Sequence, residues 1–311
     1  MQTILGAGGG IGTDLAKELT SFTDTIRLVG RNPKKINEND FLLKADLTNK
    51  EDVFKAVEGS EICYLTVGLK YSFKVWQREW PVLMDNVIAA CKEYNSKLVF
   101  FDNVYALGAE SMGNITEESP MNPCSRKGIV RAEVERKILS AVEKGEINAI
   151  IARAPDFFGP IKENSALNIM VYDNLAKGKK AQWLCNAKVP HTFGFTPDLA
   201  KGTAMLGNAA DAYNQIWNLP VPKNTLTGEE WINLFAEKMN VPAKFMVMPK
   251  WAVSTLGVFV PIMKEIAEMT YQNDRPYVFN SSKFDKRFNL KLTGLRAGVE
   301  RTIEFMHDVG K

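Results

Sequence analysis

Two cations four residues apart first suggest chemistry in this chain. Lys127 and Arg131 lie in CSRKGIVRAEVERKI, residues 124–138, a stretch typical of a helix that follows a loop. One helical turn puts both on one face, where they could attract an anion or meet Asp102 and Glu135 in ordinary surface ion pairs. Lys127 could donate a proton if burial made it more acidic, whereas an arginine stays protonated.

Polar and aromatic residues follow two of the expected strands and are the next candidates. The run KLVFFDN, residues 97–103, ends in Asp102, and Tyr105 comes just after it as an alternative acid. Lys70 and Tyr71 follow the run EICYLTVG, residues 61–68, and could line the open end of a cofactor site. A packed loop is the alternative role for Tyr71.

A glycine-rich turn near the start of the chain predicts a phosphate site. In LGAGGGIG, Gly6, Gly9 and Gly12 are spaced three apart, between an expected strand and an expected helix. Glycines there allow a tight turn, a close approach of backbone to a pyrophosphate and close helix packing. The N–H groups of the helix N-terminus attract phosphate. The predicted contacts with a dinucleotide include Gly8, Gly10 and Ile11.

The residue after the second expected strand bears on the choice of cofactor. VGRNP offers Arg31 and no carboxylate. A carboxylate there would bind the ribose 2′-hydroxyl of NAD, whereas an arginine suits the 2′-phosphate of NADP. We therefore expect NADP(H) to be favoured over NAD(H). Asp46, after the third strand, could accept from the adenine amino group; a helix N-cap at Asp46 or Thr48 is the alternative.

The elements that must position these residues alternate between strands and helices. Apolar runs of the kind found in strands buried on both faces occur at 2–5, 25–30, 41–47, 61–68, 97–103 and 147–155. Helical stretches separate them, including 75–94, where Pro81 could introduce a bend. The alternation predicts an α/β fold with a doubly wound parallel Rossmann sheet over residues 1–160. The irregular, aromatic-rich remainder, 161–311, predicts a smaller C-terminal substrate lobe.

Composition excludes several classes of function. A net charge of +3 and the lack of a basic block argue against nucleic acid. The four cysteines share no metal or redox spacing and suit a reducing compartment, and two histidines exclude a histidine-rich metal site. We expect no metal ion and a small-molecule substrate.

The longest apolar stretch does not suggest a membrane protein. WAVSTLGVFVPIM, residues 251–263, is too short to cross a bilayer, and we expect a buried helix or a lid over a pocket. No basic leader precedes the first strand. We therefore expect a cytoplasmic protein without a membrane partner.

Several motifs together resemble the extended and atypical short-chain dehydrogenase/reductases, in their epimerase/dehydratase-like branch. The glycine turn, ADLTN (45–49), YLTVG (64–68), ARAPDFFGP (152–160), HTFGFTPDLAKG (191–202) and SSKFDKRFNLKLT (281–293) occur in the order of that family. The resemblance implies that segments near 191–205 and 281–305 return to the sheet domain. It also implies a homodimer through the helices near 75–94 and 120–144. The cofactor contacts that it adds are Leu47, Thr66, Val67, Gly68, Arg131 and Ala154.

The catalytic signature of that family is missing. The family uses a Ser or Thr after the fifth strand and a Tyr-x-x-x-Lys on the next helix. Here Lys127 falls at the tyrosine position and Arg131 at the lysine position, and Asp102 and Asn103 follow the strand. Arg131 could still hold ribose hydroxyls, while Lys127 or Tyr105 would handle the proton.

The remaining candidates belong to the expected substrate lobe. His191 could face a substrate, or it could belong to a turn before a strand. Phe157, Phe158, Trp183 and Trp251 could be pocket walls or core residues. Asp198, after Pro197, reads most simply as a helix N-cap.

Three functions agree with these features. The first is an NADP(H)-dependent oxidoreductase that acts on a small carbonyl or enone-like compound. The second is a sensor or scaffold that binds NADP(H) without catalysis, because the signature tyrosine is missing. The third, suggested by fold analogy alone, is a sugar-nucleotide epimerase or dehydratase, whose chemistry needs the missing tyrosine.

Overall fold

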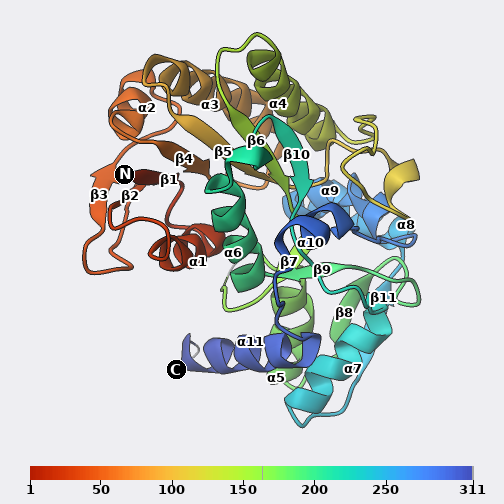
Figure 1. The fold of residues 1–311 in the computed structure, drawn as a ribbon. Helices are drawn as coiled ribbons and strands as arrows, with labels where there is room; N and C mark the ends of the chain where they lie inside the picture. Colours follow the sequence, from red (N-terminus) through yellow and green to blue (C-terminus); the bar gives the residue numbers. More distant parts are fainter. Residues whose placement is uncertain (163, 310–311) are drawn as a thin grey trace. The chain divides into compact units, whose positions relative to one another are not determined.

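The structure of the protein is a computed structural model, which describes residues 1–162 and 164–309 (Figure 1). The chain forms two compact units. Unit 1 consists of Met1–Ala106, Met121–Ala154 and Leu199–Leu219. Unit 2 consists of Leu107–Pro120, Pro155–Asp198 and Pro220–Lys311. The division at 154/155 lies close to the boundary predicted at residue 160, and the returning segment near 191–205 is split between the units.

Unit 1 is built on a seven-stranded sheet in which every pair of neighbours is parallel. Its order is β10-β6-β5-β4-β1-β2-β3. The strands are β1 (Gln2–Leu5), β2 (Ile26–Gly30), β3 (Phe41–Lys44), β4 (Ile62–Leu65), β5 (Lys97–Asp102), β6 (Ala149–Arg153) and β10 (Gln215–Asn218). The predicted doubly wound parallel sheet is confirmed. The strand order reverses between β1 and β4, where ligands bind in open α/β sheets.

Helices cover both faces of this sheet. Figure 1 shows α2, α3 and α4 on one face and α1 and α6 on the other. Their bounds are α1 (Gly10–Leu19), α2 (Lys50–Val57), α3 (Phe73–Glu93), α4 (Arg126–Glu143) and α6 (Thr196–Gly207), with a 3-10 turn η3 (Ala210–Ala212). Successive side chains of β4 point to opposite faces of the sheet. Cys63 belongs to the core under α2, α3 and α4, whereas Tyr64 packs against Gly207 of α6.

Local chemistry explains where the helices of unit 1 begin. Ser125 caps α4 by accepting a hydrogen bond from the Gly128 N–H at 3.0 Å. Asn49 caps α2 in the same way, through the Asp52 N–H. The predicted cap at Asp46 or Thr48 is therefore wrong by one to three residues. Pro81 lies inside α3, which continues through it.

Unit 2 is a set of helices and two small parallel strand pairs around an aromatic core. Phe158, Phe193, Phe195 and Trp231 pack together within that core. The strands are β7 (Asp156–Phe158), β8 (Ala181–Leu184), β9 (Phe193–Phe195) and β11 (Phe245–Met248). The helices are η1 (Ala109–Ser111), η2 (Leu167–Tyr172), α5 (Asp173–Ala176), α7 (Gly228–Lys238), α8 (Lys250–Phe259), α9 (Pro261–Ala267), η4 (Thr270–Gln272), α10 (Ser282–Phe288) and α11 (Leu295–Val309).

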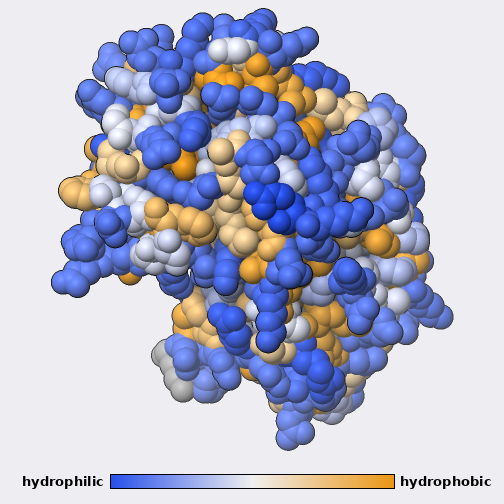
Figure 2. Space-filling view, in the orientation of Figure 1, coloured by the Kyte–Doolittle hydropathy of each residue, from blue (hydrophilic) through white to orange (hydrophobic). Residues whose placement is uncertain are grey.

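The long apolar stretch forms α8 and α9 and is not a buried helix. Trp251 is 72% exposed and Phe259 is 78% exposed, whereas Val253 and Gly257 are the buried residues of α8. Gly257 lets α9 approach, since a Cβ there would lie 3.0 Å from the Lys264 Cα. Trp251 is therefore neither core nor an enclosed pocket wall. Elsewhere Figure 2 shows a mostly hydrophilic face on which apolar residues are scattered in small patches.

Candidate functional site

The turn after β1 has the shape of a phosphate cradle. Gly6 has φ +103°, and a Cβ there would lie 2.6 Å from the Val67 backbone. A Cβ on Gly12 would lie 2.9 Å from the Gly6 carbonyl oxygen. Gly9, at the N-cap of α1, has no side chain with which to cap the helix, and Gly8 and Gly9 are exposed. The first turn of α1 therefore presents backbone N–H groups, as a phosphate group requires.

The predicted adenosine contacts lie at the carboxyl ends of β2 and β3. Arg31 is exposed directly after β2, and Asp46 is exposed two residues after β3. Asp46 accepts hydrogen bonds from the Thr48 N–H at 2.9 Å and the Thr48 hydroxyl at 2.7 Å. These bonds lower the pKa of Asp46, and the positive charge of Arg31 lowers it further. The structure therefore brings Arg31 and Asp46 together, and Leu47 is buried beside them.

The loop after β4 forms the other wall of the cradle. The Thr66 hydroxyl lies 3.4 Å from the Gly6 carbonyl oxygen, and Val67 contacts Gly6 directly. Gly68 and Lys70 are exposed further along the loop. Ala154, after β6, is buried, and its N–H donates to the Asp102 carbonyl oxygen at 2.9 Å. These predicted cofactor contacts thus follow neighbouring parallel strands at one edge of the sheet.

Lys127 lies inside the protein rather than on a solvated helix face. Its side chain is fully buried, and Nζ lies 4.6 Å from the centroid of the Tyr71 ring. An ammonium over an aromatic face is stabilised by the ring quadrupole. The Tyr71 and Tyr105 hydroxyls lie 3.4 Å apart. Lys127, Tyr71 and Tyr105, which come from three separate segments, therefore converge.

Tyr105 is held by its backbone and by its ring. Its N–H donates to the Asn103 side-chain oxygen at 2.8 Å, and its ring stacks on Trp76 with centroids 6.0 Å apart. Its carbonyl oxygen faces Gly128, where a Cβ would lie only 2.4 Å away. The first turn of α4 can approach Tyr105 this closely because residue 128 is a glycine.

Arg131 points into the interior instead of offering its guanidinium to a ribose. It is 3% exposed and forms an ion pair with Asp102, which is 1% exposed. Its Cζ lies 4.2 Å from the Trp80 ring centroid and 4.8 Å from that of Phe100. A planar, weakly hydrated guanidinium tolerates such a place when a carboxylate and aromatic faces surround it. The ion-pair alternative for Arg131 thus describes the contact, but the pair is buried and not on the surface.

A second buried ion pair lies next to the first and was not predicted. Arg153 donates to Glu135 through Nη2 at 2.5 Å and Nε at 3.3 Å, and both side chains are fully buried. The pKa of Glu135 is raised to about 7, and burial is the largest cause. The neighbouring Asp102 carboxylate also raises this pKa, whereas Arg153 lowers it. One sequence signal was available: Lys127, Arg131 and Glu135 recur every four residues, on the helix stripe that also carries Val134 and Ile138.

The substrate candidates of unit 2 form a packed cluster. His191 is 1% exposed, stacks on Tyr277 with centroids 4.4 Å apart, and bonds through Nε2 to the Asp156 carboxylate at 2.9 Å. Trp183 is buried with its ring edge-on to His191, and Phe157 is half-buried. Within this cluster, the carboxylate of Asp156 is partly accessible to solvent, because its side chain is 30% exposed.

Asp198 does not cap a helix. It lies in the first turn of α6 and accepts from the Thr293 N–H at 2.8 Å and the Thr293 hydroxyl at 2.9 Å. The predicted N-cap is wrong, because α6 begins two residues earlier and the carboxylate is directed to another segment of unit 2.

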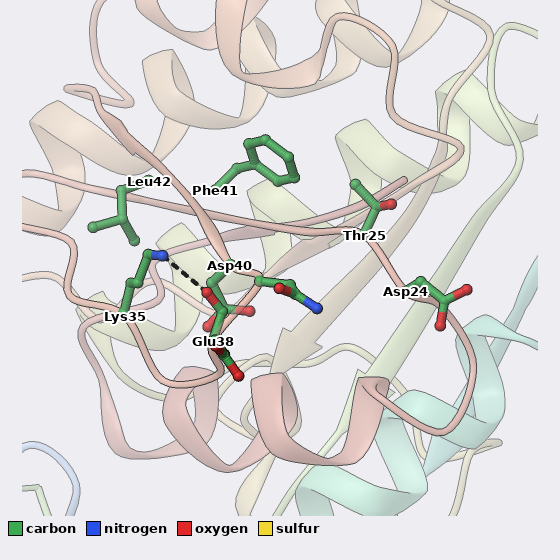
Figure 3. Close-up of a pocket in the computed structure, with 8 residues that line it drawn as sticks. Asp24, Thr25, Lys35, Glu38, Asp40, Phe41 and Leu42 are labelled. Carbon is green, nitrogen blue, oxygen red and sulfur yellow. Dashed lines mark hydrogen bonds between the residues drawn. The ribbon is translucent and has the colours of Figure 1, made fainter.

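A shallow cavity of about 660 Å³ lies at the opposite edge of the sheet (Figure 3). It lies beside Thr25 and Phe41, at the amino ends of β2 and β3. Lys35 lines it and donates to the Glu38 carbonyl oxygen at 2.8 Å. Cofactors of such folds bind beyond the carboxyl ends of the strands, so we do not assign this cavity to the cofactor.

Within residues 1–162 and 164–309, none of the helices combines the length and the apolar composition that spanning a bilayer requires. In the same part of the chain, no three His, Cys, Asp or Glu side chains gather as a metal site would require.

Solved structures share this fold over nearly the whole chain. DesIV (dTDP-glucose 4,6-dehydratase) from Streptomyces venezuelae, a double mutant with NAD bound, has a TM-score of 0.82 at 12% identity and covers 99% of this chain and 97% of its own. UDP-glucuronic acid 4-epimerase from Bacillus cereus, in complex with NAD, has a TM-score of 0.81 at 15% identity and covers 100% of both. UDP-glucose 4-epimerase from Thermus thermophilus, also with NAD, has a TM-score of 0.76 at 16% identity and covers 99% of both. These likenesses concern the fold.

No curated protein matches the sequence significantly. The model described as "NAD dependent epimerase/dehydratase family" matches residues 3–219, more than half of the chain. The chain therefore belongs to the NAD dependent epimerase/dehydratase family.

Proposed function

We propose that the protein is an NADP(H)-dependent oxidoreductase of this family that reduces or oxidises a small carbonyl or enone-like compound. The observation that carries this proposal is the convergence of Lys127, Tyr71 and Tyr105, in which the Tyr71 and Tyr105 hydroxyls lie 3.4 Å apart. These are proton-transferring groups that stand in for the missing tyrosine of the helix.

The cofactor part of the proposal is supported by the fit of the cradle. The tight turn that Gly6 and Gly12 allow, the open position at Gly8 and the uncapped start of α1 suit the pyrophosphate of a dinucleotide. When bound, a nicotinamide supplies hydride chemistry. Arg31, exposed after β2, would meet the 2′-phosphate of NADP. The three structural neighbours described above contain NAD, so the proposed preference for NADP rests on Arg31 alone.

The proton chemistry follows from the types of the converging residues. In the reducing direction, the Tyr105 hydroxyl would give its proton to the substrate oxygen, while a bound dihydronicotinamide would supply the hydride to the substrate carbon. The phenolate so formed is stabilised by the ammonium of Lys127 and by the Tyr71 hydroxyl, because a nearby cation favours the charged form of a phenol. In the oxidising direction the same groups would remove the proton.

A sugar-nucleotide epimerase or dehydratase is the second candidate function. The structural neighbours with those activities favour it. Against it, a lysine occupies the position of the helix tyrosine, so one of the converging tyrosines would have to replace that base. If the chain binds NADPH and turns over neither class of compound, the sensor or scaffold alternative replaces both.

Turnover measured through the nicotinamide absorbance tests the proposal. The intact protein is offered NADPH with a panel of carbonyls and enones, and in parallel NAD with UDP- and dTDP-sugars, whose products are separated by chromatography. For an active compound, Tyr105→Phe and Lys127→Met should each lower kcat by roughly 10²–10⁴. Tyr94→Phe is the control, because Tyr94 lies at the end of α3 before β5 begins. Unchanged kcat in both site variants would contradict the assignment.

We also propose that a homodimer forms through α3 and α4. Val82 of α3 is 47% exposed and Ile129 of α4 is 56% exposed, which supports an apolar contact on these helices. Light scattering of the intact protein should give the mass of two chains, and Val82→Asp with Ile129→Asp should reduce it to one. A monomeric wild-type protein would contradict this proposal.

A further inference from the structure

Four charged side chains form one buried cluster behind the converging residues. Asp102, Arg131, Glu135 and Arg153, here called the buried quartet, are 1%, 3%, 0% and 0% exposed. Arg131 pairs with Asp102, Arg153 pairs with Glu135, and the two carboxyl groups are neighbours. The quartet thus joins the ends of β5 and β6 to the middle of α4.

Stability alone does not explain the buried quartet. A buried ion pair is often no more stabilising than apolar residues of the same volume. Three of its atoms, Asp102 Oδ2, Arg131 Nε and Arg153 Nη1, find no hydrogen-bond partner among the described residues. Each such group loses the hydrogen bonds that it would form with water, which destabilises the folded state. An arrangement that keeps these costs points to a role besides folding.

The acceptor without a partner, Asp102 Oδ2, points to a proton within the quartet. Asp102 Oδ2 can only accept, so a proton on the neighbouring Glu135 would supply a donor to the Asp102 carboxylate. Burial raises the pKa of Glu135 to about 7, which places this protonation near neutral pH. Arg153 from β6 and Asp102 from β5 lie beside Glu135, and Arg131 precedes it by one turn on its own helix. Near Arg131, α3 contributes the uncharged indoles of Trp76 and Trp80.

A short chain of hydrogen bonds connects the quartet to Tyr105. Asp102 Oδ1 accepts from Arg131 and from the Asn103 N–H, the latter at 2.6 Å. The Asn103 side-chain oxygen in turn accepts from the Tyr105 N–H at 2.8 Å. On its other side, the Tyr105 carbonyl oxygen is pressed against Gly128. A change in the Asp102 carboxylate therefore reaches the Tyr105 backbone through two hydrogen bonds.

We infer that the buried quartet is the positioning device of the site. A proton shared by Asp102 and Glu135 sets the Asn103–Tyr105 turn, and so sets where the Tyr105 hydroxyl lies relative to Tyr71 and Lys127. Asp102, Arg131, Glu135 and Arg153 are then positioning residues. Only the consequence for turnover rests on the proposed function; the coupling of protonation to position does not.

Tyrosine NMR of the intact protein tests the coupling without any cofactor or substrate. The protein is labelled at the ring carbon that bears the hydroxyl, and Tyr71, Tyr105 and Tyr94 are assigned from their Phe variants. Tyr105 should show a pH-dependent step with a midpoint near that of Glu135, about 7, and Tyr94 should not. A flat Tyr105 signal in the wild-type protein would overturn the inference, and this arm needs no quartet variant to fold.

Two variants and one control distinguish a change in the position of Tyr105 from a direct electrostatic effect of the Glu135 charge. Glu135→Gln should abolish the Tyr105 step, whereas Glu133→Gln, on the exposed side of α4, should leave it. Asn103→Ala removes the hydrogen bond to the Tyr105 N–H and should also abolish the step, although Glu135 still titrates. A step of unchanged size in Asn103→Ala would mean that only the charge is sensed, and the inference fails.

The pH profile of turnover distinguishes this inference from the proposed function. In an active enzyme, Glu135→Gln should remove one limb near neutral pH from the kcat profile, with KM changed less than twofold. If the Tyr105 signal shows the pH-dependent step but the protein turns over no compound, the proposed function is wrong and the inferred role of the buried quartet stands. If the protein is active but the Tyr105 signal shows no pH-dependent step, the inferred role of the buried quartet is wrong and the proposed function stands.

Discussion

Removing one member of the buried Asp102–Arg131 ion pair should lower the free energy of unfolding much more than removing one member of an exposed ion pair. In Arg131→Met, the methionine keeps apolar contact with the rings of Trp80 and Phe100, but the Asp102 carboxylate loses its counter-ion inside the protein. Leaving a buried charge unpaired costs about 3–5 kcal/mol. The expected fall in unfolding free energy is therefore a large part of the stability of a typical domain.

The matched control comes from the same helix. Lys137 of α4 pairs with Asp85 at 2.8 Å, and their side chains are 29% and 58% exposed. Exposed pairs contribute about 0.2–1 kcal/mol, so Lys137→Met should cost no more than that. The comparison therefore separates burial from the mere presence of an ion pair.

Urea unfolding, followed by tryptophan fluorescence and circular dichroism, measures both effects. Trp76 and Trp80 lie beside Arg131 and report on its surroundings. The double variant Asp102→Asn, Arg131→Met should cost less than Arg131→Met alone, because no unpaired charge remains. If Arg131→Met costs as little as Lys137→Met, the buried pair is not what holds β5 to α4, and the reasoning is refuted.

The other predictions concern the glycines and the pH dependence of stability. Gly8→Ala should leave the melting temperature unchanged, since its Cβ would meet no described atom within 4 Å, yet weaken dinucleotide binding in a fluorescence titration. Gly12→Ala should lower stability by about 1–3 kcal/mol, because its Cβ would crowd the Gly6 carbonyl oxygen; equal effects of the two changes would contradict the cradle. The native protein holds a proton on Glu135 that the unfolded chain releases, so unfolding free energy should fall as pH rises from 4.5 to about 7. The fall from this group is at most about 3 kcal/mol, and it should be missing in Glu135→Gln; identical pH profiles would refute it. Gly228→Ala should destabilise unit 2, because a Cβ there would lie 2.3 Å from the Trp183 ring, and Gly294→Ala is the control in calorimetry.

Much of the fold could be read from the sequence because its signals are local. Continuous apolar runs located the strands from β1 to β6, and the spacing of Gly6, Gly9 and Gly12 located the turn into α1. Gly12 packs against Ala7 and the Gly6 carbonyl oxygen, which is a short-range constraint. These features need no knowledge of distant residues.

The burial of charge could not be read in the same way. The charges of α4 look like a solvated face, and what buries them comes from elsewhere: Tyr71 covers Lys127, and Trp80 and Asp102 receive Arg131. The apolar stretch at α8 gave the opposite error: it was predicted to be buried, but Phe259 is exposed. Apolar composition alone does not say which residues cover a surface. The contacts that decided both cases are distant in sequence.

The most direct test of the account is an equilibrium titration of the intact protein with NADPH and with NADH, read by tryptophan fluorescence. We predict saturable binding of NADPH and much weaker binding of NADH, and Arg31→Ala should bring the two affinities together. Equal affinities in the wild-type protein would contradict the role of Arg31. Binding of neither dinucleotide would contradict the cofactor site, and with it the proposed reaction.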